Sequence, residues 1–169
     1  MLRRLLLYTS FILTVLSCAS IVRIDDYSKL KFNIINKEQP IGTLSINKIN
    51  LKEDLYDINS IENNVDKHVT ILKESIFPDN DNSIMFIAAH SGTGKIAYFN
   101  DLDKLEVNDQ VNLIINHNKY TYLVKDKWED IKDGYININK DREKQLILTT
   151  CSTRNSNYQL IVNCIEKES

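Results

Sequence analysis

The sequence predicts a mainly β protein, a closed or nearly closed barrel of seven or eight short strands with short helical insertions, preceded by an N-terminal transmembrane helix. Two observations support this fold class. Short apolar or alternating segments, separated by polar turns, follow one another from residue 41 to residue 165. Before them, residues 5–22 form an apolar run that contains no acidic residue.

The N-terminal run is long enough to cross a bilayer. As a helix its 18 residues span about 27 Å. Two arginines precede the run, which favours a cytoplasmic N-terminus and an extracytoplasmic body. We therefore expect residues 1–23 to be a retained single-pass anchor that contacts the membrane through residues 5–22. A cleaved signal peptide and a lipoprotein signal acylated at Cys18 are the alternatives, and both also export the body.

The remaining composition is that of one globular domain. The chain has 169 residues, 43% of them hydrophobic and 26% charged. Its 21 basic and 23 acidic residues give a net charge of −2, which argues against nucleic acid as a partner. Residues 24–40 are polar and read as a juxtamembrane stalk or first helix, and residues 41–169 read as the folded domain.

The first half of the domain reads as strands with one helical interruption. Residues 41–46 alternate between apolar and polar, residues 47–48 make a turn and residues 49–51 resume the pattern, which predicts a strand or hairpin. Residues 69–75 predict one or two helical turns. Residues 83–89 are a continuous apolar run, typical of a buried central strand.

The second half supplies the remaining strands. Apolar residues spaced at helical intervals predict a short helix over 97–105. Segments 111–115 and 120–124 flank a four-residue turn and predict a hairpin. Segments 145–150 and 158–165 are the last two strands.

Two residues with reactive side chains stand at strand ends. Cys151 follows an apolar strand and enters a polar loop, and His90 follows another and enters a loop that contains glycine. Rigid strands commonly present catalytic groups in this way. A Cys–His pair supplies a thiolate nucleophile and a proton carrier. The alternative is that both are strand-end residues without a chemical role.

Five segments together resemble the sortase family. Leu-Thr-Thr-Cys at 148–151 resembles the family's cysteine signature, and Ile-Ala-Ala-His-Ser-Gly at 87–92 resembles its histidine segment. Residues 41–49 resemble its first strand, and residues 107–111 and 120–124 its middle hairpin. The resemblance runs in order over nearly the whole body.

The resemblance implies a sortase-like barrel with a catalytic domain at 41–169 that performs transpeptidation. Cys151 would attack a sorting signal similar to Leu-Pro-x-Thr-Gly and form a thioester. His90 would protonate the leaving amine. The acceptor would be an amine of peptidoglycan or of a pilin or other surface protein. Thr149 and Thr150 would help to line the substrate groove, and no metal or organic cofactor is needed.

One position departs from the family pattern. Sortases carry an arginine at the start of the final strand, where this chain has Gln159, eight residues after Cys151. Arg154 in the intervening loop could fold back and take over, Gln159 could donate a neutral hydrogen bond, or the protein could be a weak or inactive relative that only binds peptide. The short spacing between Cys151 and Gln159 argues against the sortase class that has a long loop between these two positions.

For the other reactive side chains, the sequence predicts structural roles. We expect His68 to be a surface or helix-start residue, His117 to lie solvated in the hairpin turn, and Cys164 to be packed in the last strand. Residues 79–82 resemble a fragment of a calcium loop but lack its spacing, so we expect a turn and no metal site. A disulfide between Cys151 and Cys164 would block the nucleophile.

Overall fold

The computed structural model describes residues 38–138 and 144–167. Residues 38–169 belong to one compact unit. The predicted anchor, and all of the predicted stalk except its last three residues, lie outside the described residues. Within the described ranges, no helix is long and apolar enough to cross a bilayer.

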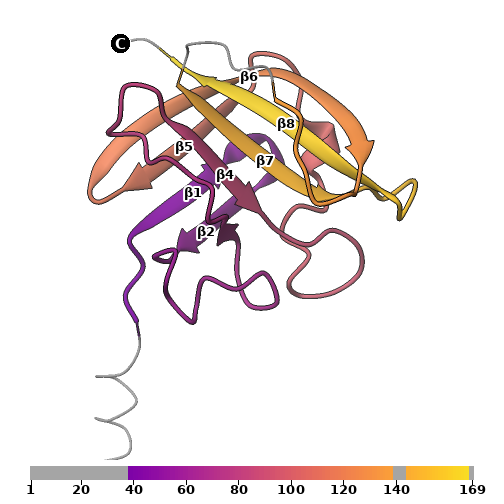
Figure 1. The fold of residues 1–169 in the computed structure, drawn as a ribbon, viewed down its shortest axis with the longest axis horizontal. Helices are drawn as coiled ribbons and strands as arrows, with labels where there is room; N and C mark the ends of the chain where they lie inside the picture. Colours follow the sequence, from indigo (N-terminus) through magenta and orange to yellow (C-terminus); the bar gives the residue numbers. More distant parts are fainter. Residues whose placement is uncertain (1–37, 139–143, 168–169) are drawn as a thin grey trace, which may run out of the picture. The chain divides into compact units, whose positions relative to one another are not determined.

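One sheet of eight strands wraps into a nearly closed barrel (Figure 1). The strands are β1 (Gly42–Ile46), β2 (Leu51–Leu55), β3 (Thr70–Ile71), β4 (Ile84–Ala88), β5 (Gln110–Ile115), β6 (Asn118–Ile131), β7 (Gln145–Cys151) and β8 (Tyr158–Glu166). Their order in the sheet is β2-β1-β5-β6-β8-β7-β4-β3. The pair β4–β7 is parallel and the others are antiparallel. The prediction of a mainly β barrel is confirmed.

The core lies on the inner face of this sheet. Alternate residues of most strands point inward, because successive side chains of a strand face opposite sides. The fully buried side chains include Leu44, Ile46, Met85, Ile87, Val111, Leu113, Leu146 and Leu148. Burial of such side chains contributes roughly 1.5–3 kcal/mol each before entropic costs. The apolar pattern of the sequence therefore determines which face is internal in the strands whose burial alternates, such as β1, β4 and β5.

The prediction of helical turns over 69–75 is wrong. Thr70 and Ile71 form β3, which pairs antiparallel with the end of β4. The Asn63 side chain extends this pairing, because its Oδ1 accepts from the Ile71 N–H at 2.8 Å and its Nδ2 donates to the Ile71 carbonyl at 2.9 Å. Three consecutive β-branched residues begin at Val69 and favour the extended backbone over the helix.

The predicted helix over 97–105 is reduced to a short 3-10 helix, η2 (Leu102–Lys104), within a series of turns. Its apolar residues Phe99, Leu102 and Leu105 are buried as expected. Their spacing of three matches the three residues per turn of a 3-10 helix, so the same pattern suits the tighter element. A second 3-10 helix, η1 (Asn47–Ile49), makes the predicted turn between β1 and β2.

The predicted hairpin is tighter and longer than expected. Its turn has two residues, Asn116 and His117, with φ angles of 49° and 71°. Two positive φ angles are the signature of the turn that matches strand twist best. β6 then continues to Ile131, far beyond the predicted end at 124, with a register shift between Val124 and Asp126. The extension brings the end of β6 beside the start of β8.

Candidate active site

Cys151 is the last residue of a strand that is otherwise buried. Every residue of β7 before it is buried, whereas Cys151 is half-buried. β7 lies between β4 and β8, so the strand is held along both edges. Cys151, the candidate nucleophile, therefore lies at the partly exposed end of a strand that is otherwise buried and is paired along both edges.

His90 reaches the same end of the sheet from the neighbouring strand. The parallel β4–β7 pair keeps an offset of 61 residues along its length, from Ile84 opposite Gln145 to Ala88 opposite Thr149. Continued two residues past the last pair, the same offset would align His90 with Cys151. The two segments also contact each other past the end of β4, because the Ser91 side-chain hydroxyl donates to the Cys151 carbonyl at 2.6 Å. Figure 1 shows β4 and β7 side by side.

An acid contacts the histidine. His90 Nε2 lies 3.0 Å from Asp66 Oδ1, and the two side chains are 37% and 77% exposed. A carboxylate in this position can hold an imidazole in one orientation and stabilise its protonated form. The sequence analysis missed Asp66, since nothing in the local pattern marks a contact made across 24 residues.

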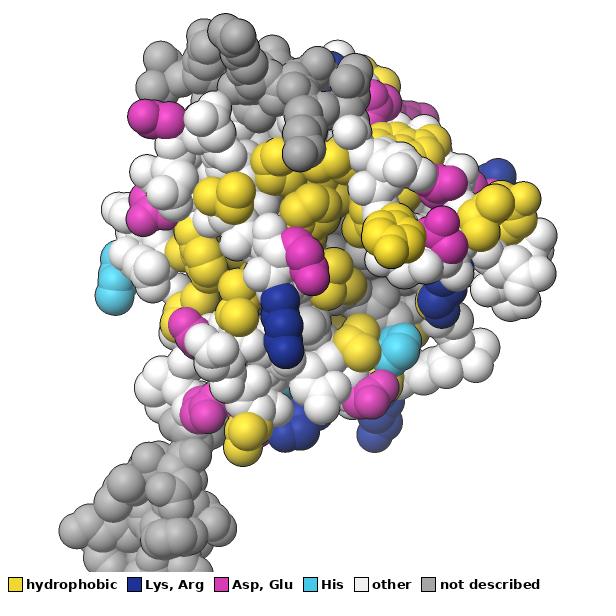
Figure 2. All heavy atoms as spheres, in the orientation of Figure 1, with side chains coloured by type: hydrophobic (Ala, Val, Ile, Leu, Met, Phe, Trp, Pro, Cys, Tyr) yellow, Lys and Arg dark blue, Asp and Glu magenta, His cyan; other side chains and the backbone are white. Residues whose placement is uncertain are grey.

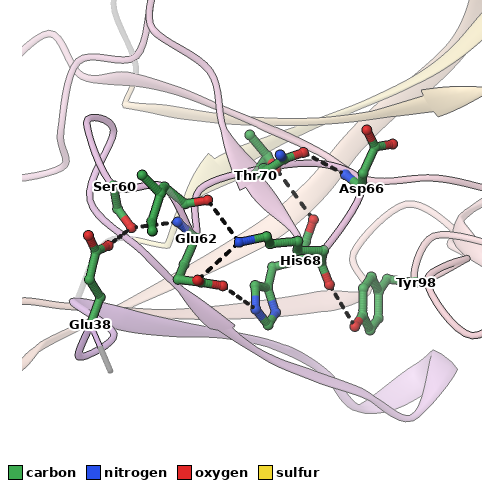
Figure 3. A network of polar contacts seen from close by, with 10 residues as sticks. Glu38, Ser60, Glu62, Asp66, His68, Thr70 and Tyr98 are labelled. Carbon is green, nitrogen blue, oxygen red and sulfur yellow. Dashed lines mark hydrogen bonds and ion pairs between the residues drawn. The ribbon is translucent and has the colours of Figure 1, made fainter. Parts of the chain in front are cut away.

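A polar network holds the segment that carries Asp66 (Figure 3). Lys67 Nζ donates to Glu62 Oε1 at 3.0 Å, and His68 Nε2 lies 3.4 Å from the other oxygen of that carboxylate. The hydrogen bond from Lys67 lowers the pKa of Glu62. The Tyr98 hydroxyl donates to the Lys67 carbonyl at 3.2 Å and so ties this segment to the loop that follows His90.

A narrow cavity opens beside the thiol. Its lining consists of Phe99, Asn100, Asp103, Glu129, Thr150, Cys151, Ser152, Thr153, Arg154 and Leu160. A neighbouring hollow shares part of this lining and adds Lys127 and Trp128. In Figure 2, hydrophobic side chains gather on the face that β4, β7 and β8 present, with charged side chains around them. In the cavity lining itself, Phe99 and Leu160 are apolar, and the other side chains apart from the thiol are polar or charged.

Gln159 lies directly opposite Cys151 in the antiparallel β7–β8 pair. Its side-chain amide donates to the Tyr135 carbonyl at 2.6 Å and makes a long contact of 3.5 Å with the Ile131 carbonyl. The amide therefore fastens the chain segment that follows β6.

Arg154 lies in the exposed loop after Cys151 and lines the cavity beside the thiol. The loop is shaped by Ser152, whose hydroxyl oxygen accepts from the Arg154 backbone N–H at 3.1 Å. The same hydroxyl donates to Glu129 Oε1 at 2.8 Å. The structure therefore brings Arg154 and Cys151 to one cavity.

A further cation at the thiol was missed by the sequence analysis. Lys132 Nζ lies 3.1 Å from Cys151 Sγ and donates to it. Lys132 follows the last residue of β6, so it reaches this site only because β6 is longer than its sequence pattern suggests. No local signal in the sequence singles out this lysine among the others.

The two threonines before the cysteine make backbone contacts. Thr149 Oγ1 donates to the Leu160 carbonyl at 3.1 Å, and Thr150 Oγ1 donates to the Ala89 carbonyl at 2.7 Å. Thr150 lines the cavity, and Thr149 is not among the residues found there. Both hydroxyls therefore fix the strands on either side of Cys151.

The other reactive residues adopt the places expected of structural groups. Cys164 is fully buried, and burial raises the pKa of its thiol far above the usual range. It pairs with Leu146 at the opposite end of β7 from Cys151, and both cysteines are free. His68 is partly buried against Tyr56 in a turn and begins no helix. His117 lies in the hairpin turn as predicted.

Residues 79–82 form the predicted turn. Within the described ranges, no group of three or more His, Cys, Asp or Glu residues is arranged to hold a metal ion.

Fold and site together define a class: a β-barrel that presents a cysteine and a histidine on adjoining strand ends beside a groove. The sequence model of the sortase domain family matches residues 44–166. This chain belongs to the sortase family.

Individual relatives agree with this assignment. Sortase D of Bacillus subtilis (strain 168) is 32% identical over 114 residues, which make up 67% of this chain and 54% of that protein. This chain thus spans about half the length of that relative. The crystal structure of sortase C1 from Streptococcus agalactiae matches with a TM-score of 0.67 and 27% identity, over 80% of this chain and 71% of the other. Sortase C from Clostridium perfringens SM101 shares the fold, with a TM-score of 0.63 and 24% identity over 78% and 71% of the two chains.

Proposed function

We propose that this protein is a transpeptidase that cleaves a sorting signal similar to Leu-Pro-x-Thr-Gly and transfers the acyl part to an amine. The observation that supports the proposal is the register of β4 and β7: continued two residues past its last pair, it aligns His90 with Cys151, and Cys151 lines a narrow cavity. Membership of the sortase family supports the same chemistry.

The reaction divides into two acyl transfers. The Cys151 thiolate attacks the carbonyl carbon of the scissile peptide bond, and the C–N bond breaks as His90 gives a proton to the leaving amine. The products are a thioester on Cys151 and a free amine. An acceptor amine then attacks the thioester and loses its proton to His90, and the Cys151 thiolate departs. Thr149 and Thr150 keep the strands around the nucleophile in register.

The partners and location follow from this function. The donor is the sorting-signal peptide of a surface protein, and the acceptor is an amine of peptidoglycan or of a pilin. Residues 5–22 hold the protein in the cell membrane, with the catalytic domain on the extracytoplasmic side.

Mass spectrometry tests the proposal directly. The full-length chain in detergent micelles is incubated with a pool of Leu-Pro-x-Thr-Gly-like peptides and an amine acceptor. We expect an acyl adduct on Cys151 and a transpeptidated product, both absent in Cys151→Ala and both greatly reduced in His90→Ala. A folded protein with a free thiol that forms no adduct with any peptide of the pool would contradict the proposal.

A second function is favoured by one observation. The Gln159 amide donates to the backbone of the segment after β6 and not to the thiol. A chain without the family's arginine could bind a sorting signal and release it unchanged. In that case peptide binding would be measurable by fluorescence anisotropy, while Cys151→Ala would bind as well as the unmodified protein and neither would form product.

A further inference from the structure

The thiol of Cys151 has a cation as its direct neighbour. Lys132 Nζ donates to Sγ at 3.1 Å, a normal distance for a hydrogen bond to sulfur. Hydrogen bonds from a charged donor are stronger than those between neutral groups. The contact joins residues 19 positions apart, so it is a product of the fold.

The acids nearest to Lys132 in the sequence have hydrogen-bond partners other than Lys132. Glu129 accepts from the Ser152 hydroxyl, and Asp130 accepts from the Asn137 side chain and from the backbone. Asp133 accepts from the Tyr135 backbone N–H. In the part of the chain that the structure describes, Lys132 forms no ion pair with an acid. Among the described residues, the thiol is therefore the side chain that the Lys132 ammonium contacts directly.

The backbone at Lys132 is fixed on both sides. Its own N–H donates to the Asn157 carbonyl at 2.9 Å, which continues the β6–β8 pairing by one residue. Gln159 fastens the Tyr135 carbonyl a few residues further along. Thus the residue at the position of the family's arginine holds the segment that delivers a lysine to the thiol.

We propose that Lys132 is a catalytic residue, the cation that stabilises negative charge at the reacting centre of this protein. This inference rests on the proposed transpeptidase function. Before attack, the ammonium faces the charge on Sγ. When the thiolate adds to the carbonyl, that charge passes to the carbonyl oxygen, and the flexible four-carbon stem of the lysine lets its N–H groups follow. Lys132 keeps its protons throughout, while His90 carries the proton of the leaving amine.

The alternative cation has a different neighbourhood. Arg154 lines the same cavity together with two carboxylates, Asp103 and Glu129. Among the described residues, the Arg154 guanidinium makes no hydrogen bond to the thiol, whereas Lys132 Nζ donates to Sγ. The direct contact between Nζ and Sγ therefore favours Lys132 over Arg154 as the cation that stabilises negative charge at the reacting centre.

The first test measures charge at the thiol without any peptide substrate. The full-length chain is treated with iodoacetate, which is anionic, and with iodoacetamide, which is neutral, and modification of Cys151 is quantified by peptide mapping. We expect Lys132→Gln to lower the iodoacetate-to-iodoacetamide rate ratio by about threefold to tenfold, the size expected for one unit charge about 4 Å away in a water-like medium. Lys119→Gln, at the far end of β6, is the matched control and should leave the ratio unchanged. An unchanged ratio in Lys132→Gln would overturn the inference.

The second test measures turnover. We expect Lys132→Gln to lower kcat/KM by roughly 10²–10³-fold, as for removal of one donor to a developing oxyanion. Lys132→Arg should restore much of the loss, and so should the double variant Lys132→Gln with Gln159→Arg, which returns a cation from the opposite side. Full activity in Lys132→Gln, or failure of both cationic variants to restore it while their circular dichroism is native, would overturn the inference.

These outcomes separate the inference from the proposed function. If the unmodified protein forms the Cys151 adduct but Lys132→Gln turns over normally, only the role of Lys132 fails. If no peptide acylates Cys151 in the unmodified protein, the proposed function fails and the catalytic role falls with it. An acyl group mapped to Lys132 would make that amine a nucleophile and would also overturn the proposed role.

Discussion

At the scale of the residue, the two cysteines of the β7–β8 hairpin differ in burial and in their neighbours, and these differences determine how reactive each thiol can be. Cys151 is half-buried at the open end of β7 with Lys132 at its sulfur. Cys164 faces the core at the other end of the same hairpin, fully buried. The thiolate is the reactive form of a cysteine, and burial without a cation disfavours it.

We predict that the two thiols differ strongly in reactivity. Iodoacetamide at neutral pH should modify Cys151 at least about tenfold faster than Cys164, because burial raises the pKa of the Cys164 thiol. Peptide mapping of a time course measures both rates in one sample. The Cys164→Ser variant should leave the Cys151 rate unchanged, and equal rates in the native protein would contradict the assignment.

Asp66 is predicted to position His90. Asp66→Asn should lower kcat by less than about tenfold and leave KM unchanged, since a largely exposed carboxylate contributes far less than a buried one. Steady-state kinetics at several pH values should also show an altered acid limb. Asp81→Asn, in an exposed turn, serves as the control. A rise in KM with kcat unchanged would assign Asp66 to substrate binding.

At the scale of the element, two strands determine the site. β4 and β7 carry His90 and Cys151, and their apolar patterns made both strands predictable. The sequence predicts an end of β6 at 124 because residues 125–131 are mostly charged and show no hydrophobic pattern. In the structure this second half of β6 is at most partly buried. Its pairing with β8 fixes it instead, and this is why Lys132 could not be found from the sequence.

The close packing of β1 on β5 leads to a prediction about Gly42. A Cβ atom at this position would lie 2.0 Å from the Ile114 carbonyl oxygen, which belongs to the neighbouring backbone. Gly42→Ala should therefore lower the free energy of unfolding by about 1–3 kcal/mol. Urea denaturation measures this change. Ser45→Ala in the same strand removes atoms and should cost less, and equal stability of Gly42→Ala and the native protein would contradict the packing.

The segment of Figure 3 is predicted to loosen in acid. The pKa of Glu62 is lowered in the folded protein, mainly by the hydrogen bond from Lys67. A lowered pKa stabilises the fold above the ordinary glutamate range, and this contribution is lost as the pH falls through the folded-state pKa. Hydrogen-exchange protection of the Lys67 and His68 amides should drop there. Glu62→Gln should show the lower protection already at neutral pH, and a pH-independent protection in the native protein would oppose this account.

At the scale of the whole molecule, the sequence predicted the barrel and most of its strands, but it did not predict two side chains at the candidate site, Asp66 and Lys132. The barrel, the packed Cys164 and the two strand-end residues follow from apolar patterning. Burial of one strand face leaves a period of two in the sequence, and burial of both faces, as in β7, leaves a continuous apolar run. Asp66 and Lys132 carry no such mark. They are exposed, polar and brought to Cys151 and His90 only by the closure of the sheet. The short β3 was mistaken for helix since two residues cannot show a period.

The parallel pairing of β4 with β7 also has a consequence for biogenesis. The two strands that carry the reactive pair are 61 positions apart, so a chain emerging amino-terminus first presents His90 long before its partner exists. Contacts between distant segments form slowly because loop closure precedes them. In refolding experiments, recovery of thiol reactivity towards an anionic reagent should lag behind formation of the β5–β6 hairpin. The arrangement of His90 and Cys151 would then be complete only after β7 has paired with β4.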